Sequence, residues 1–144
     1  MIKIVNGDLL KAKAQVIGHQ TNCFGAAGGL AGVIFKTYPE CVAPYERICE
    51  MGKALGKAQL LKCNDGKVLA NLFGQYQPGA TTDYRYVKSS LEDLKDQMEH
   101  LKLTSLALPY GMGAGIGGGD WSKIHLIIHE VFEDSPIEVT LCRL

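Results

Sequence analysis

Apolar residues follow two different spacings along this chain, and the spacing predicts the secondary structure. Short apolar runs, which are typical of buried strands, occupy residues 2–5, 14–20, 58–62, 67–73, 104–108 and 137–142. Stretches with the spacing of amphipathic helices occupy residues 30–38, 45–51, 84–101 and 121–132. In the long helix over 84–101, the apolar stripe falls at Val87, Leu91, Leu94, Met98 and Leu101.

The order of these elements favours a layered α/β sandwich around a mixed sheet. Strands and helices alternate through most of the chain, which is typical of α/β folds. The strands over 58–62 and 67–73 are separated by Asn64-Asp65-Gly66, so we expect them to form an antiparallel hairpin. The length of 144 residues suits one domain, and nothing in the sequence divides it, so we expect a single domain over 1–144.

Two glycine-rich loops stand out because each follows a predicted strand and precedes a predicted helix. One spans residues 110–120 and the other residues 21–30. Glycine lets backbone N–H groups approach a ligand closely, and the start of a helix adds partial positive charge, so such loops favour phosphate. A tight turn or linker is the alternative for either loop taken alone. Two such loops at strand ends predict one crevice that binds a phosphate-bearing ligand.

A dinucleotide-binding fold is a weaker explanation of the loop over residues 110–120. Gly113, Gly115 and Gly118 satisfy the pattern G-x-G-x-x-G. That fingerprint belongs to the first strand and helix of a long parallel sheet, with an acidic residue after the next strand. Here the chain ends after one more strand, so a Rossmann dehydrogenase is disfavoured.

The charge balance and the cysteines of the chain bear on which ligands and partners we expect it to bind. Fifteen basic and fifteen acidic residues balance to a formal charge of zero, so no global field attracts nucleic acid or anionic lipid. The five cysteines are scattered and never spaced as C-x-x-C, which is typical of reduced thiols in a cytoplasmic protein. We expect no zinc site, no other metal and no cofactor. No signal sequence or membrane-spanning run is apparent.

Few residues are candidates for chemistry. His19 ends an apolar strand before a glycine-rich loop, where it is either a base or nucleophile, or a histidine bonded to the backbone. His125 and His129 share a helix face and favour a solvated surface over a metal site. Asp120 favours an N-cap over catalysis, and Asp8 favours a turn or cap over a ligand contact, on local sequence alone.

Four separated motifs together resemble the macrodomain family. They are VNGDL at 5–9, VIGHQTNC at 16–23, GGLA at 28–31 and LPYGMGAGI at 108–116. Their order covers essentially the whole chain. The resemblance implies a three-layer α/β/α sandwich with a mixed central sheet, and it implies that ADP-ribose binds in a crevice across its top.

The same resemblance implies roles for individual residues. Asp8 and Leu9 would contact adenine, Asn22 would bind the distal ribose, and Leu144 would lie near the adenine. The remaining implied contacts lie in the two loops, which would flank and wrap the diphosphate: Gly28, Gly29, Leu30, Ala31, Pro109, Tyr110, Gly111, Met112, Gly113, Ala114, Gly115 and Ile116.

The sequence departs from the catalytic branches of that family at several positions. One branch usually has asparagine in place of His19 and a catalytic aspartate about where Ala31 stands. A compact branch uses a lysine, which would fall near Gln75 or Tyr76, and an aspartate near Gly117. Both pairs are missing here.

The histidine that remains is similar to one in small macrodomain phosphatases that process ADP-ribose 1″-phosphate. This resemblance implies that His19 acts as base or nucleophile, with Asp120 as a helper. A non-catalytic reader of free or protein-linked ADP-ribose is one alternative. Hydrolysis of ADP-ribose from protein or nucleic acid is another, and nucleic acid is expected as a partner only in that form.

Overall fold

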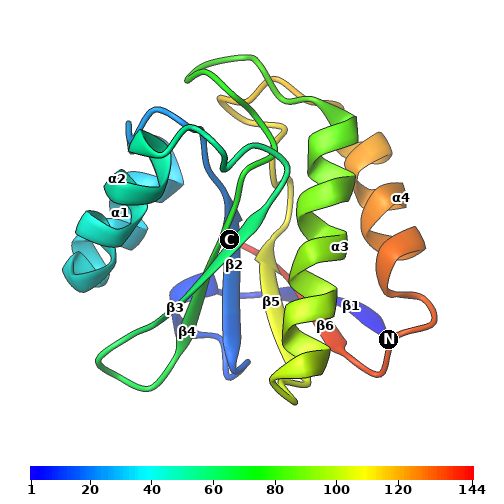
Figure 1. Cartoon of the computed structure of the whole chain (residues 1–144). Helices are drawn as coiled ribbons and strands as arrows, with labels where there is room; N and C mark the ends of the chain where they lie inside the picture. Colours follow the sequence, from blue (N-terminus) through cyan, green and yellow to red (C-terminus); the bar gives the residue numbers. More distant parts are fainter.

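Six strands form one mixed sheet in the order β1-β6-β5-β2-β4-β3 in the computed structural model, which describes residues 1–144. The strands are β1 Ile2–Asn6, β2 Val16–Gln20, β3 Ala58–Lys62, β4 Val68–Leu72, β5 Ser105–Pro109 and β6 Glu138–Arg143. The helices are α1 Gly29–Thr37, α2 Val42–Glu50, α3 Tyr84–His100 and α4 Trp121–Phe132, with short 3-10 turns at Leu9–Lys11 and Pro39–Cys41. Figure 1 shows α1 and α2 on one side of the sheet and α3 and α4 on the other. The three-layer α/β/α prediction is confirmed.

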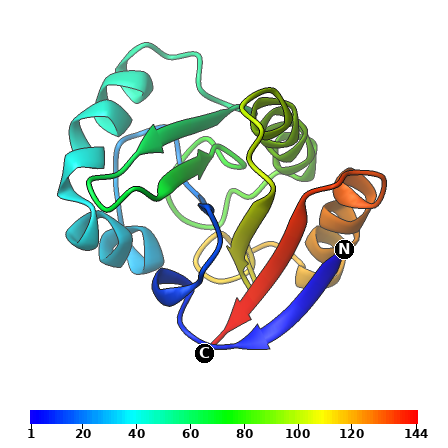
Figure 2. The same cartoon turned by 90° about the horizontal axis from the view of Figure 1, so that it is seen from below.

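The direction of the strands brings their carboxyl ends to one edge of the sheet. All neighbouring pairs are parallel except β3 and β4, which form the predicted hairpin. Figure 2 shows the sheet from below, with β1 and β6 side by side at one edge. The chain leaves β2 toward α1 on one face, whereas it leaves the adjacent β5 toward α4 on the other face. Loops that diverge from adjacent parallel strands in this way open a crevice between them.

Each face of the sheet has its own apolar core. The core under α3 and α4 includes Leu94, Met98 and Ile128, and the core under α1 and α2 includes Ile34 and Phe35. These residues come from the predicted helical stripes, so hydrophobic periodicity identified both packing faces.

Leu101 was wrongly predicted to belong to the buried stripe of α3. It is 55% exposed because α3 ends at His100 and Leu101 is the C-cap. The backbone then turns away at Lys102, whose φ is 61°. Helical periodicity therefore stops one residue before the predicted apolar position.

The other boundaries differ little from the sequence prediction. The second helix begins at Val42 rather than Tyr45, because the 3-10 turn Pro39–Cys41 leads directly into it. Pro44 is accommodated within the first turn, where its missing N–H costs no helical hydrogen bond. None of the helices combines the length and the apolar character needed to cross a lipid bilayer.

Replacing Leu94 with alanine should lower the free energy of unfolding by about 2–5 kcal/mol, because the side chain is fully buried in the α3–α4 core. Leu101→Ala, on the same helix, should change it by less than about 0.5 kcal/mol because that side chain is mostly exposed. Urea unfolding followed by circular dichroism measures both. Equal losses in the two variants would contradict the assignment of the core.

Candidate functional site

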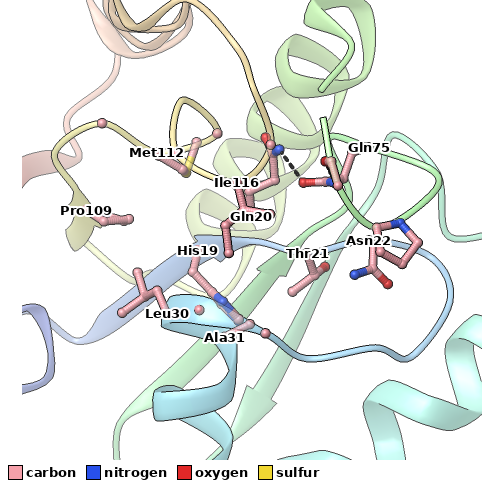
Figure 3. Close-up of a pocket in the computed structure, with 18 of the residues that line it drawn as sticks. His19, Gln20, Thr21, Asn22, Leu30, Ala31, Gln75, Pro109, Met112 and Ile116 are labelled. Atoms are coloured by element: carbon pink, nitrogen blue, oxygen red, sulfur yellow. Dashed lines mark hydrogen bonds between the residues drawn. The ribbon is translucent and has the colours of Figure 1, made fainter. Parts of the chain in front are cut away.

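A cavity of about 410 Å³ lies at the carboxyl edge of the sheet between the two glycine-rich loops. Its wall is formed by the end of β2, the first turn of α1, the loop after β4 and the loop after β5. Figure 3 shows residues from these segments around the same space, although they are far apart in sequence. The two loops that the sequence predicted to share a crevice therefore meet.

Most of the residues predicted for the site line this cavity. They are His19, Asn22, Gly28, Gly29, Leu30, Ala31, Pro109, Tyr110, Gly111, Met112, Gly113, Gly115 and Ile116. Five other predicted residues do not line it: Asp8, Leu9, Ala114, Asp120 and Leu144. Their predicted roles have no support from the cavity wall.

Asp8 lies at the same sheet edge but has a local partner. Its carboxylate accepts a hydrogen bond from the N–H of Leu10 at 3.0 Å and caps the 3-10 turn that follows β1. Leu9 is buried in the core under α1 and α2, and Leu144 is 99% exposed. The capping role considered for Asp8 is confirmed, and the adenine contacts at Asp8, Leu9 and Leu144 stay predictions.

The loop after β5 presents several backbone donors that have no partner in the protein. Its internal hydrogen bonds use the N–H groups of Met112, Ala114, Gly118 and Gly119. The N–H groups that bond to no other part of the protein belong to Gly111, Gly113, Gly115, Ile116 and Gly117, which all line the cavity. Unpaired N–H groups gathered in a concave loop favour an anion.

The start of α1 adds a second set of donors on the opposite wall. The helix begins at Gly29, and no side chain caps it. Its first backbone hydrogen bond runs from Gly32 N–H to the carbonyl of Gly28, so the N–H groups before Gly32 in the helix are free. Gly29 has a φ of 54°, and a Cβ built there would lie 2.9 Å from Cδ1 of Ile116. A Cβ at position 29 would meet only the end of the Ile116 side chain, so it is mainly the left-handed φ that requires glycine where the two loops touch.

No lysine, arginine, aspartate or glutamate lines the cavity. Any attraction for an anion must therefore come from backbone N–H groups and the end of α1. Such donors are fixed in the fold and need little reordering when a ligand binds.

Asn22 has a structural role in the loop that leads to α1. Its Oδ1 accepts a hydrogen bond from Phe24 N–H at 2.9 Å, and its backbone carbonyl accepts one from the hydroxyl of Tyr45 at 2.9 Å. Its Nδ2 donates to the carbonyl of Ala26 at 2.7 Å, which leaves one amide hydrogen free. The side chain thus holds the loop while keeping one donor available to the cavity.

His19 lies at the floor of the cavity, on the side of α1. Its ring contacts the edge of Phe35 with centroids 5.7 Å apart, and Figure 3 shows it near Leu30 and Ala31. The Nε2 atom lies 2.6 Å from Oδ1 of Asn71, whereas Nδ1 is buried and has no partner. Burial lowers the pKa of His19 to about 4, so the imidazole is neutral at pH 7.

Sequence reasoning missed the polar residues that extend from His19. Nδ2 of Asn71 donates to Oε1 of Gln59 at 3.0 Å, and Nε2 of Gln59 donates to the carbonyl of Pro44 at 3.1 Å. Asn71 is completely buried, and its only signal in the sequence is a polar residue inside the apolar run of β4.

Two neighbours of His19 that line the cavity also carry buried polar atoms without a partner. Oε1 of Gln20 and Oγ1 of Thr21 are buried without a hydrogen-bond partner, as Nδ1 of His19 is. Buried polar atoms are normally paired, so three consecutive exceptions at one strand end point to a site that receives polar groups of a ligand.

Comparison with known proteins decides the family. No protein-family model matches the chain. A DNA ADP-ribosyl glycohydrolase of Mycobacterium tuberculosis is 30% identical over 141 residues, which span 94% of this chain and 40% of that protein. The chain thus covers well under half of that relative. Human ADP-ribose glycohydrolase OARD1 is 27% identical, and the match covers 99% of this chain and 91% of that protein.

Solved structures agree over nearly the whole length. The macrodomain of Mycobacterium tuberculosis DarG has a TM-score of 0.90 at 28% identity, with 99% of this chain and 97% of that chain covered. The chain belongs to the macrodomain family. The macrodomain of Thermus aquaticus DarG is similar as well, with a TM-score of 0.88 at 26% identity and 99% and 97% coverage.

The lysine of the compact macrodomain branch was expected near Gln75 or Tyr76 and its aspartate near Gly117, and of these residues Gln75 and Gly117 are neighbours in this macrodomain. A Cβ built at Gly117 would lie 3.2 Å from Oε1 of Gln75. Gln75 is buried, accepts from Nε2 of Gln20 at 2.9 Å, and donates to the carbonyl of Gly79 at 2.9 Å. Neither Gln75 nor Gly117 carries an ionisable group, and the Gln75 amide instead ties the loop after β4 to β2.

Thr82 makes a second contact that holds the loop after β5. The hydroxyl of Thr82 accepts from Nε2 of Gln20 at 2.8 Å and donates to the carbonyl of Gly113 at 3.0 Å. Gln20 and Thr82 therefore join the ends of β2 and β4 to the loop after β5. Sequence reasoning gave no role to either residue.

The remaining candidates lie outside the cavity. Asp120 accepts from the N–H and the hydroxyl of Ser122 at 2.9 and 2.7 Å, so the predicted N-cap of α4 is confirmed. Its catalytic role stays a prediction. His129 is exposed and its Nε2 lies 3.2 Å from Nε2 of His125, which stacks on Trp121. No group of three or more metal-ligating side chains occurs.

The cysteines are unsuited to nucleophilic chemistry. All five are free. Burial raises the pKa of Cys23 to about 11 and that of Cys63 to about 12, so their thiolates are scarce at neutral pH.

The neutral state of His19 should make stability depend on pH. Its folded pKa of about 4 lies below the ordinary value of 6.5, so the unfolded chain binds more protons between these values. The contribution of His19 to the free energy of unfolding is therefore fully present above pH 6.5. It falls as the pH drops toward 4, by about 3 kcal/mol in total.

His19→Asn should remove this part of the pH dependence, because an amide does not titrate. Urea unfolding of both proteins from pH 7.5 to 4 isolates the difference, since all other groups are shared. Parallel curves for the two proteins would refute a buried neutral imidazole.

Proposed function

We propose that this macrodomain binds ADP-ribose in the cavity and hydrolyses an ADP-ribosyl derivative at the distal ribose. The observation that supports binding most strongly is the convergence of two sets of unpaired backbone N–H groups on one cavity without charged side chains. The names of the relatives, DNA ADP-ribosyl glycohydrolase and ADP-ribose glycohydrolase, support the hydrolase class.

In this proposal the diphosphate lies between the first turn of α1 and the loop after β5. The free N–H groups of Gly113, Gly115, Ile116 and Gly117 and those at the start of α1 bond its oxygens from opposite sides. The free amide hydrogen of Asn22 bonds a hydroxyl of the distal ribose. The 1″ carbon is then held near the end of β2.

His19 is proposed to act on the attacking water. A neutral imidazole with an unpartnered Nδ1 accepts a hydrogen bond and can take a proton from water as the water bonds to the 1″ carbon. The bond from that carbon to the leaving group breaks, and the proton is passed to the departing group. Since the pKa of His19 is about 4, the imidazole is uncharged at pH 7 and holds no proton to donate before it has taken one from water.

Hydrolysis of ADP-ribose 1″-phosphate is the second candidate. It is favoured by the histidine at position 19 together with the absence of a lysine at Gln75 or Tyr76 and of an aspartate at Gly117. Water then attacks phosphorus, the bond from phosphorus to the 1″ oxygen breaks, and phosphate and ADP-ribose are released. The two reactions differ in the bond that is cleaved.

Titration calorimetry should show binding of ADP-ribose with a Kd in the micromolar range, which corresponds to a binding free energy of about −8 kcal/mol. Gly115→Glu should weaken binding at least about 100-fold, because it places a carboxylate beside the diphosphate donors. A Cβ at Gly115 meets nothing within 4 Å, so the fold should tolerate the change. Gly115→Lys is the matched control and should keep the affinity, and similar losses in both would argue for a steric effect only.

Turnover should be measured on three substrates: ADP-ribose 1″-phosphate, an ADP-ribosylated DNA oligonucleotide and an ADP-ribosylated protein. Phosphate release identifies the phosphatase, and release of ADP-ribose from a macromolecule identifies the glycohydrolase. His19→Asn should lower kcat by about 100-fold or more while ADP-ribose binding is kept. Equal rates for the two proteins would remove His19 from the mechanism, and binding without turnover of any substrate would identify a reader.

A further inference from the structure

Three polar side chains from three adjacent strands form one row beneath the cavity. His19 in β2 is paired in register with Asn71 in β4, and Asn71 is paired in register with Gln59 in β3. The side-chain bonds follow the same row, at 2.6 Å from His19 to Asn71 and 3.0 Å from Asn71 to Gln59. The row leads from the cavity to the face of α2.

The far end of the row fixes the direction of every hydrogen bond in it. The carbonyl of Pro44 can only accept, so Gln59 must turn its Nε2 toward it. Oε1 of Gln59 then faces Asn71 and accepts from its Nδ2, and Oδ1 of Asn71 is left to face His19. An oxygen at that point requires a hydrogen on Nε2 of the imidazole.

We propose that Asn71 and Gln59 are positioning residues that hold His19 in the tautomer with hydrogen on Nε2 and a bare Nδ1. This inference rests on the proposed role of His19 at the cavity. Neither residue lines the cavity, so both act only through the imidazole. Because Nδ1 has no other partner, its lone pair is left for a ligand hydroxyl or the attacking water.

The other tautomer of His19, with hydrogen on Nδ1 and none on Nε2, conflicts with the hydrogen bonds of Asn71 and Gln59. A bare Nε2 would need an N–H from Asn71, and turning that amide would bring its oxygen against the oxygen of Gln59. Relief of that clash would require Gln59 to turn as well, which would bring its oxygen against the carbonyl of Pro44. Each such contact leaves a buried acceptor unpaired, and this is costly.

A purely structural role would not explain the row equally well. His19 and Asn71 are 1% and 0% exposed, in a face otherwise filled by apolar side chains such as Ile17 and Phe73. Apolar residues could fill this space without leaving a buried nitrogen unpaired. A row that fixes one nitrogen and leaves the other bare suits an imidazole whose bare nitrogen is used.

The test reads the tautomer and the activity separately. Nitrogen-15 NMR of protein labelled at histidine distinguishes a protonated from a bare ring nitrogen, and His19→Asn identifies the His19 signals. The wild-type protein should show hydrogen on Nε2 and none on Nδ1. Observation of hydrogen on Nδ1 in wild type would overturn the proposal.

Gln59→Leu removes the anchor while leaving His19 and Asn71 in place. It should give a mixture of tautomers and lower kcat by about tenfold or more, with the Kd for ADP-ribose unchanged. Gln59→Glu loses the bond to Pro44 but still accepts from Asn71, so Asn71 should stay oriented and the wild-type tautomer should be kept. Gln59 is only partly buried on the edge strand β3, so both variants should fold.

Asn71→Asp and Asn71→Leu give a second comparison. The carboxylate still accepts from Nε2, but its negative charge favours a doubly protonated ring, so hydrogen should appear on Nδ1 as well. Leucine removes the acceptor and should give a mixture of tautomers. A wild-type tautomer in both Gln59→Leu and Asn71→Leu would overturn the positioning role. If wild type turns over no substrate, the proposed function fails, yet the tautomer spectra still decide whether the row orients the imidazole.

Discussion

The site depends on two stretches of backbone that approach each other with little side-chain volume between them. Gly29 at the start of α1 and Ile116 in the loop after β5 are in contact, and a single added carbon at position 29 would press on Ile116. This approach gathers the unpaired N–H groups of both segments around one cavity. Since no charged side chain lines the cavity, its affinity for an anion depends on holding those two segments at that spacing.

The sheet and a set of neutral amides maintain the spacing. Adjacent parallel strands β2 and β5 send their loops to opposite faces, so the crevice opens where their carboxyl ends meet. Gln20, Gln75 and Thr82 then bond the loops after β2, β4 and β5 to one another. Gln75 therefore has a bracing role close to where a related branch was expected to have a lysine, at Gln75 or Tyr76. The bracing helps explain how this chain keeps the crevice without an ion pair there.

The chemistry at the floor follows from a buried histidine without a charged partner. Burial lowers the pKa of His19, and the amide of Asn71 offers it an acceptor without a negative charge. The result is a neutral ring with one nitrogen bonded and the other bare. This arrangement suits hydrogen-bond acceptance and a transient proton transfer better than it suits stabilisation of a phosphate by positive charge.

The sequence by itself determined the elements, the sheet edge and the two loops of this macrodomain. Hydrophobic periodicity identified the packing faces, and local chemistry identified the caps at Asp8 and Asp120, because both depend on residues a few positions apart. Only the tertiary structure decided how His19 is oriented, since its partner Asn71 is 52 residues away and meets it through strand register. It also excluded Leu101 from the core and placed Gln75 beside Gly117. Contacts of this kind depend on which strands become neighbours, and local spacing in the chain does not specify that.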